Sequence, residues 1–268
     1  MRRILVVLAL AALFGMTIPL VSADSNVVYT KRWVAGTVAH VVTVNLNSPN
    51  VIVTPAIARY GIGTSEGFGS MISRLRPAAA ITGTYFCVQS LLPVGDLVVD
   101  GNLVYSGCVG TAVCFTPENK VEFLDIRDNE KPDWSPYASV IRSGPRLVRN
   151  GVVGVSARSE GFRSSMVSKI SRRSAIGVTL NNKLLLVTVN RPVSIWTLAK
   201  AMRDLGCMEA IQLDGGSSSA LYCKGHTYSH PARRMTNLFL VYDSPERYAA
   251  VKSRLAPSPI VAATSSKS

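Results

Sequence analysis

The sequence predicts a single α+β domain with a mixed, largely antiparallel twisted sheet and a few helices. Short β-branched apolar runs alternate with turn segments rich in Asn, Asp and Gly, which is typical of antiparallel hairpins. One longer stretch places its apolar residues at helical spacing. No internal repeat or linker divides the 268 residues, so the chain reads as one domain rather than several.

The first 23 residues have the three parts of a secretory signal peptide. Arg2 and Arg3 precede an apolar run from Ile4 to Phe14, and Val21-Ser22-Ala23 offers small residues for cleavage. The alternative is a retained membrane anchor, against which Pro19 and the cleavage-like end argue. We therefore expect a secreted or periplasmic protein. Its folded domain would span residues 24–255, followed by a disordered tail at 256–268 (APSPIVAATSSKS).

The first third of the domain reads as strands with one short helix. Ala39–Val44 and Val51–Ala56 are rich in β-branched residues and flank the turn-forming segment Asn45–Asn50, which predicts a hairpin. Met71–Leu75 is a candidate short helix. Ala78–Phe86 has the composition of a buried strand that runs into a loop.

The rest of the domain contains further hairpin signals and one well-marked helix. Three pairs of short apolar runs flank turns rich in Asn, Asp or Gly: 97–99 with 103–105, 147–148 with 152–153, and 176–180 with 184–189. The helix begins after the capping residue Ser194 and ends at Gly206. Strands are then expected at Ala210–Leu213 and Leu238–Tyr242.

The chain is strongly basic, with 29 Lys and Arg against 16 Asp and Glu and a formal net charge of +13. Such a surface attracts anions such as nucleic acid, acidic membranes or phosphorylated envelope sugars. No nucleic-acid recognition motif is present, and an exported protein rarely meets nucleic acid. Envelope anions, with peripheral contact to an anionic envelope surface, are therefore the favoured partners.

Neither a metal nor a cofactor is expected. The sequence has no P-loop, dinucleotide fingerprint or HExxH motif. His226 and His230 are four residues apart, but Gly225 and Pro231 disfavour a helix that would align them. Five cysteines leave at least one thiol without a partner in the chain, and we favour Cys207–Cys223 as one disulfide pair.

The segment Ile211–Ser219 (IQLDGGSSS) is the sharpest candidate for chemistry. A buried strand delivers Asp214 to its end, and Gly215 and Gly216 allow a tight turn and the close approach of a ligand. The serines that follow offer hydroxyl and amide groups to an anion or a sugar. The alternative interpretation is a turn that Asp214 merely caps.

Two further segments suggest a sugar-phosphate site. Tyr85 follows Gly83 and Thr84 at the end of a buried run and could stack on a sugar, although a core role is equally consistent. Arginine-rich stretches around Arg146 and Arg173 could bind phosphate, because a guanidinium fork matches phosphate oxygens.

Five segments in this order resemble the phosphodiester glycosidase family over roughly residues 35–243. They are Thr82–Phe86, Ser143–Leu147 with Asn150-Gly151, Arg173–Gly177, Leu213–Ser218 and Met235–Leu238. The sequence departs from the family pattern at Thr82, where Asn is usual, and at Ser217, where a third Gly is often found.

The resemblance implies hydrolysis of a sugar-1-phosphodiester with Asp214 as the catalytic carboxylate, acting as base or nucleophile. The implied substrate-binding residues are Thr82, Gly83, Tyr85, Gly144, Arg146, Arg173, Gly215, Gly216, Ser217 and Asn237. If the sugar C1–O bond breaks, the leaving phosphate monoester needs cations rather than an acid, which Arg173 and Arg146 would supply.

Three functions remain open at this point. The first is an exported glycosidase that hydrolyses a sugar-1-phosphodiester in an envelope or extracellular glycan. The second is a glycan- or anion-binding domain of the same fold without turnover. The third is a basic structural protein of the envelope, whose glycine turns serve only the architecture.

Overall fold

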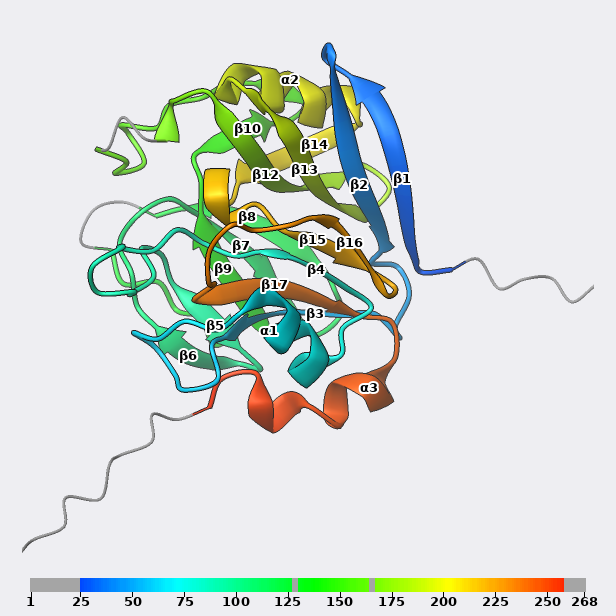
Figure 1. The fold of residues 1–268 in the computed structure, drawn as a ribbon, viewed down its shortest axis with the longest axis vertical. Helices are drawn as coiled ribbons and strands as arrows, with labels where there is room; N and C mark the ends of the chain where they lie inside the picture. The colour runs from blue at the N-terminus through cyan, green and yellow to red at the C-terminus, as the bar shows by residue number, and fades with distance from the viewer. Residues whose placement is uncertain (1–24, 127–129, 164–166, 258–268) are drawn as a thin grey trace, which may run out of the picture.

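A computed structural model describes residues 25–126, 130–163 and 167–257 of the chain (Figure 1). The signal peptide predicted at residues 1–23 and the tail residues 258–268 lie outside the described residues. Within the described part, Ala256 packs against the core, one residue past the predicted boundary at residue 255. No helix in the described ranges has the length and apolar character required to cross a membrane.

The strands form three sheets in which all named pairs are antiparallel. The seven-stranded sheet has the order β1 (Val27–Val34), β2 (Thr37–Asn45), β13 (Lys183–Val193), β12 (Ser171–Thr179), β14 (Cys207–Gln212), β10 (Arg146–Arg149) and β11 (Val152–Val153). One five-stranded sheet has the order β16 (His226–Ser229), β15 (Leu221–Cys223), β4 (Ala79–Thr82), β17 (Asn237–Tyr242) and β3 (Ile52–Ile57). The other has the order β6 (Asn102–Tyr105), β5 (Leu97–Val99), β9 (Ser139–Ser143), β7 (Thr111–Phe115) and β8 (Val121–Asp125).

The helices cover outer faces of the sheets. They are α1 (Phe68–Leu75), α2 (Ile195–Asp204) and α3 (Pro245–Ala249), with short 3-10 turns η2 (Gly216–Ser218) and η3 (Lys252–Arg254). Leu198 and Met202 of α2 pack on the seven-stranded sheet at the top of Figure 1, while Met71 and Leu75 of α1 pack against the sheet that contains β17. The α+β class predicted from the sequence is confirmed.

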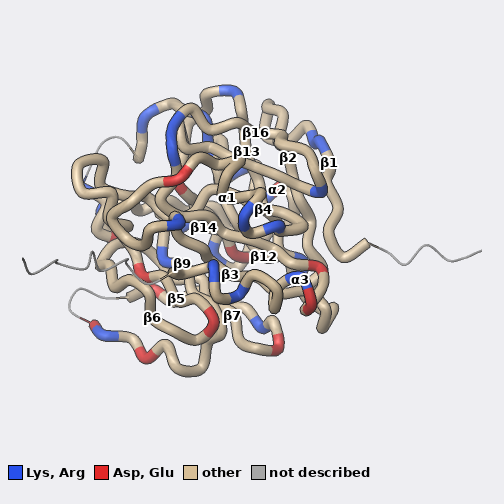
Figure 2. The backbone as a smooth tube through the Cα atoms, turned by 60° about the horizontal axis from the view of Figure 1, so that its bottom comes forward, with Lys and Arg blue, Asp and Glu red and all other residues tan. Residues whose placement is uncertain are grey.

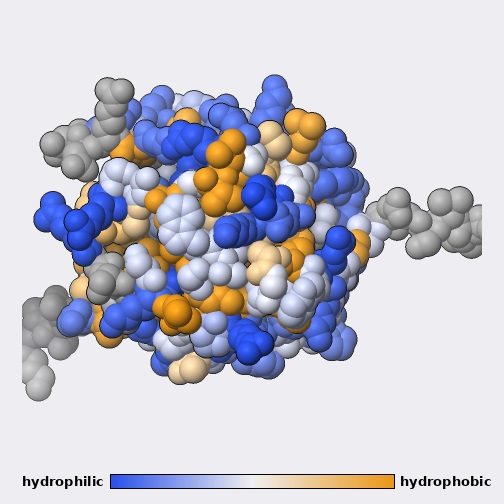
Figure 3. Space-filling model, turned by 90° about the horizontal axis from the view of Figure 1, so that it is seen from above, coloured by the Kyte–Doolittle hydropathy of each residue, from blue (hydrophilic) through white to orange (hydrophobic). Residues whose placement is uncertain are grey.

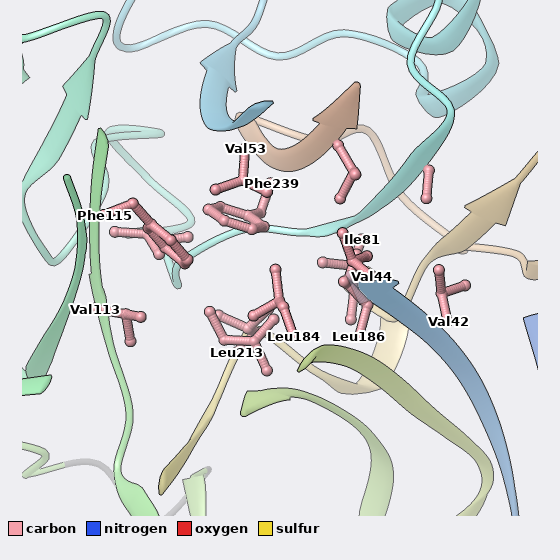
Figure 4. Packing of buried hydrophobic residues seen from close by; sticks show 14 of the residues in the cluster. Val42, Val44, Val53, Ile81, Val113, Phe115, Leu184, Leu186, Leu213 and Phe239 are labelled. Atoms are coloured by element: carbon pink, nitrogen blue, oxygen red, sulfur yellow. The ribbon is translucent and has the colours of Figure 1, made fainter. Parts of the chain in front are cut away.

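The central core lies where the three sheets face one another. Val44 of β2, Ile81 of β4, Phe115 of β7 and Phe239 of β17 come from all three sheets and converge in Figure 4. The rings of Phe115 and Phe239 are 5.4 Å apart. Because each sheet buries one face here, the three sheets hold fixed positions, and the loops at their ends are fixed with them.

Most of the local predictions are confirmed. The three later hairpins form as β5–β6, β10–β11 and β12–β13. Helix α2 begins after Ser194, whose hydroxyl accepts a hydrogen bond from the backbone N–H of Thr197 at 3.0 Å. Gly206 follows its end with a φ of 92°, a conformation that glycine adopts without strain.

The hairpin predicted over residues 39–56 is wrong. Strand β2 pairs with β1 and β13, whereas β3 pairs with β17 in a different sheet. The turn residues Asn45–Asn50 are real turn-formers, but they carry the chain from one sheet to the next. Both strands are largely buried and apolar, so the sequence pattern alone did not select their partners.

The disulfide predicted between Cys207 and Cys223 is also wrong, because both thiols are free. Cys207 packs between the seven-stranded sheet and α2, while Cys223 belongs to the central core. The two residues therefore serve two different hydrophobic clusters.

Candidate active site

A cavity of about 560 Å³ lies where the loop after β4, the segment before β12 and the end of β14 meet. Its lining includes Tyr85, Arg173, Asp214, Gly215, Gly216 and Ser217, all predicted from the sequence as site residues. These residues are up to 132 positions apart in the chain, and the antiparallel pairing of β14 with β12 brings the last five together.

Asp214 is held at the end of β14 by its neighbours on both sides. Its backbone N–H donates to the carbonyl of Gly83 at 3.0 Å, and its Oδ1 accepts from the N–H of Gly215 at 2.8 Å. The preceding residue, Leu213, donates its N–H to the backbone carbonyl of Ser174 at 2.9 Å and packs in the central core. The carboxyl group is therefore placed by backbone contacts rather than by a flexible loop.

The two glycines after Asp214 are required by space and by backbone angle. A Cβ at Gly215 would lie 2.9 Å from the carbonyl oxygen of Arg172, and Gly216 has a φ of 58°. The chain then turns through η2, and the carbonyl of Ser217 accepts the N–H of Ala232 at 2.7 Å. This last bond brings the following residue, Arg233, to the cavity.

Asp214 is set for proton chemistry near neutral pH. Burial raises the pKa of its carboxyl group to about 6, against the opposing effects of the Ser218 hydroxyl, the Gly215 N–H and the Arg233 charge. A carboxylate with such a pKa is ionised at pH 7 and remains basic enough to accept a proton from water. Asp214 is the only carboxylate among the described residues that line the cavity.

Arg173 is a buried cation without a carboxylate partner among the described residues. Its guanidinium donates to the carbonyl oxygens of Val167 at 2.7 Å and Val193 at 3.3 Å, to that of Lys169, and to a neutral side chain, Gln212 Oε1, at 3.0 Å. These contacts fix the fork without neutralising its charge. An anion in the cavity would provide the missing counter-charge.

Gln212 links the arginine to the aromatic wall. Its Oε1 accepts from Arg173 and its Nε2 donates to the hydroxyl of Tyr85. Burial raises the pKa of Tyr85, and the charge of Asp214 raises it further. The hydroxyl therefore stays protonated and can donate a hydrogen bond into the cavity.

Arg233 is a further cation of the cavity lining, which also includes Arg163 and Lys169. Its guanidinium carbon lies 4.3 Å from the centre of the Phe86 ring, and its charge favours the ionised form of Asp214. Figure 2 shows that Lys and Arg are distributed widely over the fold rather than collected in one patch. The cavity is thus a place where four cationic side chains and one aspartate line the same space within a generally basic molecule.

Several predicted substrate-binding residues lie behind the cavity wall instead of lining it. Thr82 is fully buried in β4, and Gly83 touches Asn237, whose Oδ1 would lie 1.8 Å from a Cβ at that glycine. Asn237 accepts the N–H of Thr84 at 2.7 Å and donates to its carbonyl at 3.2 Å. These residues shape the loop that carries Tyr85. The family departure at Thr82 accordingly falls outside the cavity lining.

The structure does not bring Gly144 or Arg146 into the cavity lining. Gly144 lies against Glu160 and Phe162, where a Cβ would be 2.8 Å from the Glu160 carboxylate. The Arg146 guanidinium pairs with Asp125 at 3.1 Å and with Glu209. The predicted role of Arg146 in phosphate binding is therefore corrected: its charge is already neutralised by the protein.

Sequence reasoning missed Gln212, Arg233 and Phe86 as parts of the site. The sequence could have indicated Gln212, because it is a polar residue in a buried strand. It precedes Asp214 by two positions, and residues two apart in a strand point to the same face of the sheet. Arg233 had none, because its place depends on the contact between Ser217 and Ala232. No group of three or more His, Cys, Asp or Glu side chains suited to a metal occurs in the described part of the chain.

The fold and the site define a class. The model of the phosphodiester glycosidase family matches residues 76–242, and the chain belongs to that family, a group of hydrolases. The relatives are N-acetylglucosamine-1-phosphodiester alpha-N-acetylglucosaminidases. The mouse protein is 25% identical over 170 residues, 57% of this chain and 33% of its own length. The human protein is 27% identical over 112 residues, 37% of this chain and 22% of its own length. The chain thus spans about a third or less of these relatives.

Solved structures show the same fold. The catalytic domain of the zebrafish N-acetylglucosamine-1-phosphodiester alpha-N-acetylglucosaminidase, auto-inhibited by its pro-peptide, aligns with a TM-score of 0.64 at 23% identity over 81% of this chain and 82% of that one. A hypothetical protein from Synechocystis aligns with a TM-score of 0.71 at 17% identity over 81% of this chain and 62% of that one.

Proposed function

We propose that this protein is an exported glycosidase that hydrolyses the sugar–phosphate bond of a sugar-1-phosphodiester in an envelope or extracellular glycan. The observation that carries the proposal is the convergence of Asp214 and the unneutralised Arg173 in one cavity. Family membership supports the reaction class. The signal-like N-terminus supports export, and the formal charge of +13 supports an anionic target.

In the proposed reaction the bond between sugar C1 and the phosphate oxygen breaks. Asp214 either takes a proton from the attacking water or adds to C1 itself and is released by water in a second step. The bond electrons leave with the phosphate oxygen, and the products are the free sugar and a phosphate monoester. Arg173 and Arg233 stabilise the charge that develops on the leaving phosphate.

This leaving group explains why one carboxylate is sufficient. Most glycosidases need a second carboxyl group to protonate a departing alcohol. A phosphate monoester departs as a stable anion, so a cationic site takes the place of the acid. The lining, with Asp214 as its single described carboxylate and with three arginines and one lysine, matches that requirement.

The test is hydrolysis of N-acetylglucosamine-1-phosphoryl esters in water enriched in ¹⁸O, because the relatives' name points to this sugar. We expect the label to enter the free sugar and not the phosphate. The Asp214→Asn variant should lose about a thousandfold or more in kcat, while its melting profile shows an intact fold. Label in the phosphate would contradict C1–O cleavage, and an unchanged rate in the variant would exclude Asp214.

A further inference from the structure

The cavity has two chemically different ends, with Tyr85 between them. The hydroxyl of Tyr85 faces Gln212 at the polar end, which also holds Asp214 and Arg173. The ring of Tyr85 packs edge-on against Phe162, with centroids 5.7 Å apart. One side chain therefore marks the border between a polar half and an apolar half of the same cavity.

The apolar half is built from adjoining stretches of chain. The N–H of Val94 donates to the carbonyl of Tyr85 at 2.9 Å, and the N–H of Val109 donates to that of Val94 at 3.2 Å. Val109 also lies against Gly161, next to Phe162. Val94, Val109 and Phe162 all line the cavity. These side chains offer hydrocarbon rather than the hydroxyl, amide and carboxylate groups that recognise a saccharide, while Arg163 and Lys169, next to Phe162 and Ile170 in the chain, add positive charge to the lining.

Two aliphatic side chains at the same cavity are left in solvent. Val88 is 62% exposed and Ile170 is 72% exposed, and both belong to the lining. On the face shown in Figure 3, hydrophobic and hydrophilic groups are interspersed. Exposed aliphatic groups that continue an apolar wall are a feature of ligand-binding grooves.

The position of Arg173 places the phosphate at the border. Its Nη1 contacts Gln212 of the polar half at 3.0 Å and the carbonyl of Val167 at 2.7 Å. The segment from Val167 leads through Lys169 to the exposed Ile170, and all three residues line the cavity. A phosphodiester bound at Arg173 therefore has one ester directed to Asp214 and the other directed along hydrocarbon.

We propose that the second ester of the substrate carries an apolar chain, so that the protein cleaves a sugar-1-phosphoryl lipid whose alkyl or isoprenoid group lies along Val94, Val109, Phe162, Val88 and Ile170. This inference rests on the proposed function, since it assumes that the sugar ester is cleaved at Asp214. It adds the chemical class of the leaving group, a lipid phosphate.

The test compares kcat/KM for the methyl, butyl and octyl esters of N-acetylglucosamine-1-phosphate, below the micelle concentration, with a glucosyl ester as the polar counterpart. Each methylene that becomes buried is expected to raise kcat/KM by about two- to fourfold, so the octyl ester should exceed the methyl ester by at least about thirtyfold. Equal rates for all three, or a preference for the glucosyl ester, would overturn the lipid assignment and leave the hydrolase intact.

Variants of the apolar wall test where the alkyl group of the ester lies. Ile170→Ser and Val88→Ser should each lower the octyl-to-methyl ratio by about three- to fivefold. The matched control is Leu180→Ser, since Leu180 is 82% exposed at the turn between β12 and β13 and is not part of the cavity lining; it should leave the ratio unchanged. A ratio unaffected by all three variants would place the chain elsewhere.

If no ester is hydrolysed, the proposed function fails and the inference is tested separately by calorimetry. Tighter binding of the octyl than the methyl ester, weakened by Ile170→Ser, would keep the apolar site. Equal binding of the two esters would remove it.

Discussion

Arg146 and Arg173 are both buried, at 7% and 2% exposure, and both belong to segments that resemble family motifs. Their surroundings differ in one respect. Arg146 pairs with Asp125 and Glu209 and lies over the ring of Phe123 at 5.3 Å, whereas Arg173 contacts carbonyl oxygens and a glutamine. The guanidinium of Arg146 is neutralised and has a structural role. The guanidinium of Arg173 contacts only neutral acceptors, so its charge is available to bind an anion.

The cost of burying a charge explains why the two arginines have different roles. Burying a charge without a counter-charge lowers the stability of the protein, and a buried pair offsets part of that cost. At Arg146 the protein supplies the offset in the folded state. At Arg173 the offset comes only with a bound anion, so part of the interaction energy is reserved for the ligand and for the charge that develops on it.

Replacement of Arg173 should give the largest effect. Arg173→Lys keeps the charge but loses the planar fork and its contact with Gln212, and we expect kcat/KM to fall by about 10²–10³. The measurement is steady-state hydrolysis of a sugar-1-phosphodiester, with the melting temperature as the control for folding. Activity close to that of the parent protein would mean that Arg173 is structural, as Arg146 is.

Asp214 in the cavity and Asp125 beside Arg146 should change the stability of the protein with pH in opposite directions. Burial raises the pKa of Asp214 to about 6, so the native state binds more protons than the unfolded state between about pH 4 and 6. The contribution of Asp214 to the free energy of unfolding should fall by up to about 3 kcal/mol as the pH rises through this window. Asp214→Asn should remove that contribution, so that the difference in stability between the parent protein and the variant changes with pH. Chemical denaturation at pH 4 and pH 7 measures it.

Asp125 should act in the opposite direction. Burial alone would raise its pKa, but hydrogen bonds and charge from Arg149 and Arg146 hold the pKa below its usual value. Its contribution to stability is present above the pKa of the unfolded chain and is lost as the pH falls through the lower, folded value. Asp125→Asn should therefore cost stability at pH 7 and less at pH 3. A variant whose loss grows on acidification would contradict this assignment.

Arg146→Met should affect stability more than activity. The change leaves the carboxylates of Asp125 and Glu209 without their shared partner, and both are partly exposed to water. We expect the free energy of unfolding to fall by about 1–3 kcal/mol, with kcat/KM retained within about threefold. A urea titration beside the steady-state assay gives both values. A selective loss of activity at unchanged stability would return Arg146 to the active site.

The sequence predicted the features that depend on neighbouring residues and missed those that depend on residues far apart in the chain. The turn signals at Asp100-Gly101 and Asn150-Gly151 and the cap at Ser194 act within a few residues, and the structure follows them. Sheet partners and charge neutralisation depend on residues far apart in sequence. The partner strands of β2 and β3, and the carboxylates that occupy Arg146, come from distant segments, and a single sequence carries no pairing signal for them.

Replacement of Arg233 should give the smallest effect, because Arg233 is intermediate between Arg146, which is neutralised by carboxylates, and Arg173, which is not. It lines the cavity and no carboxylate pairs with it among the described residues, yet its guanidinium lies over the half-buried Phe86 ring, a type of contact worth about 0.5–1 kcal/mol or more. We expect Arg233→Gln to lower kcat/KM by about three- to tenfold and Phe86→Leu to lower it less, since the leucine removes only the platform. Arg233 also favours the ionised form of Asp214, so its loss should move the acidic limb of the pH–rate profile upward. A lower rate with that limb unmoved would assign Arg233 to phosphate binding alone, whereas an unchanged rate would exclude Arg233 from the cations that meet the phosphate.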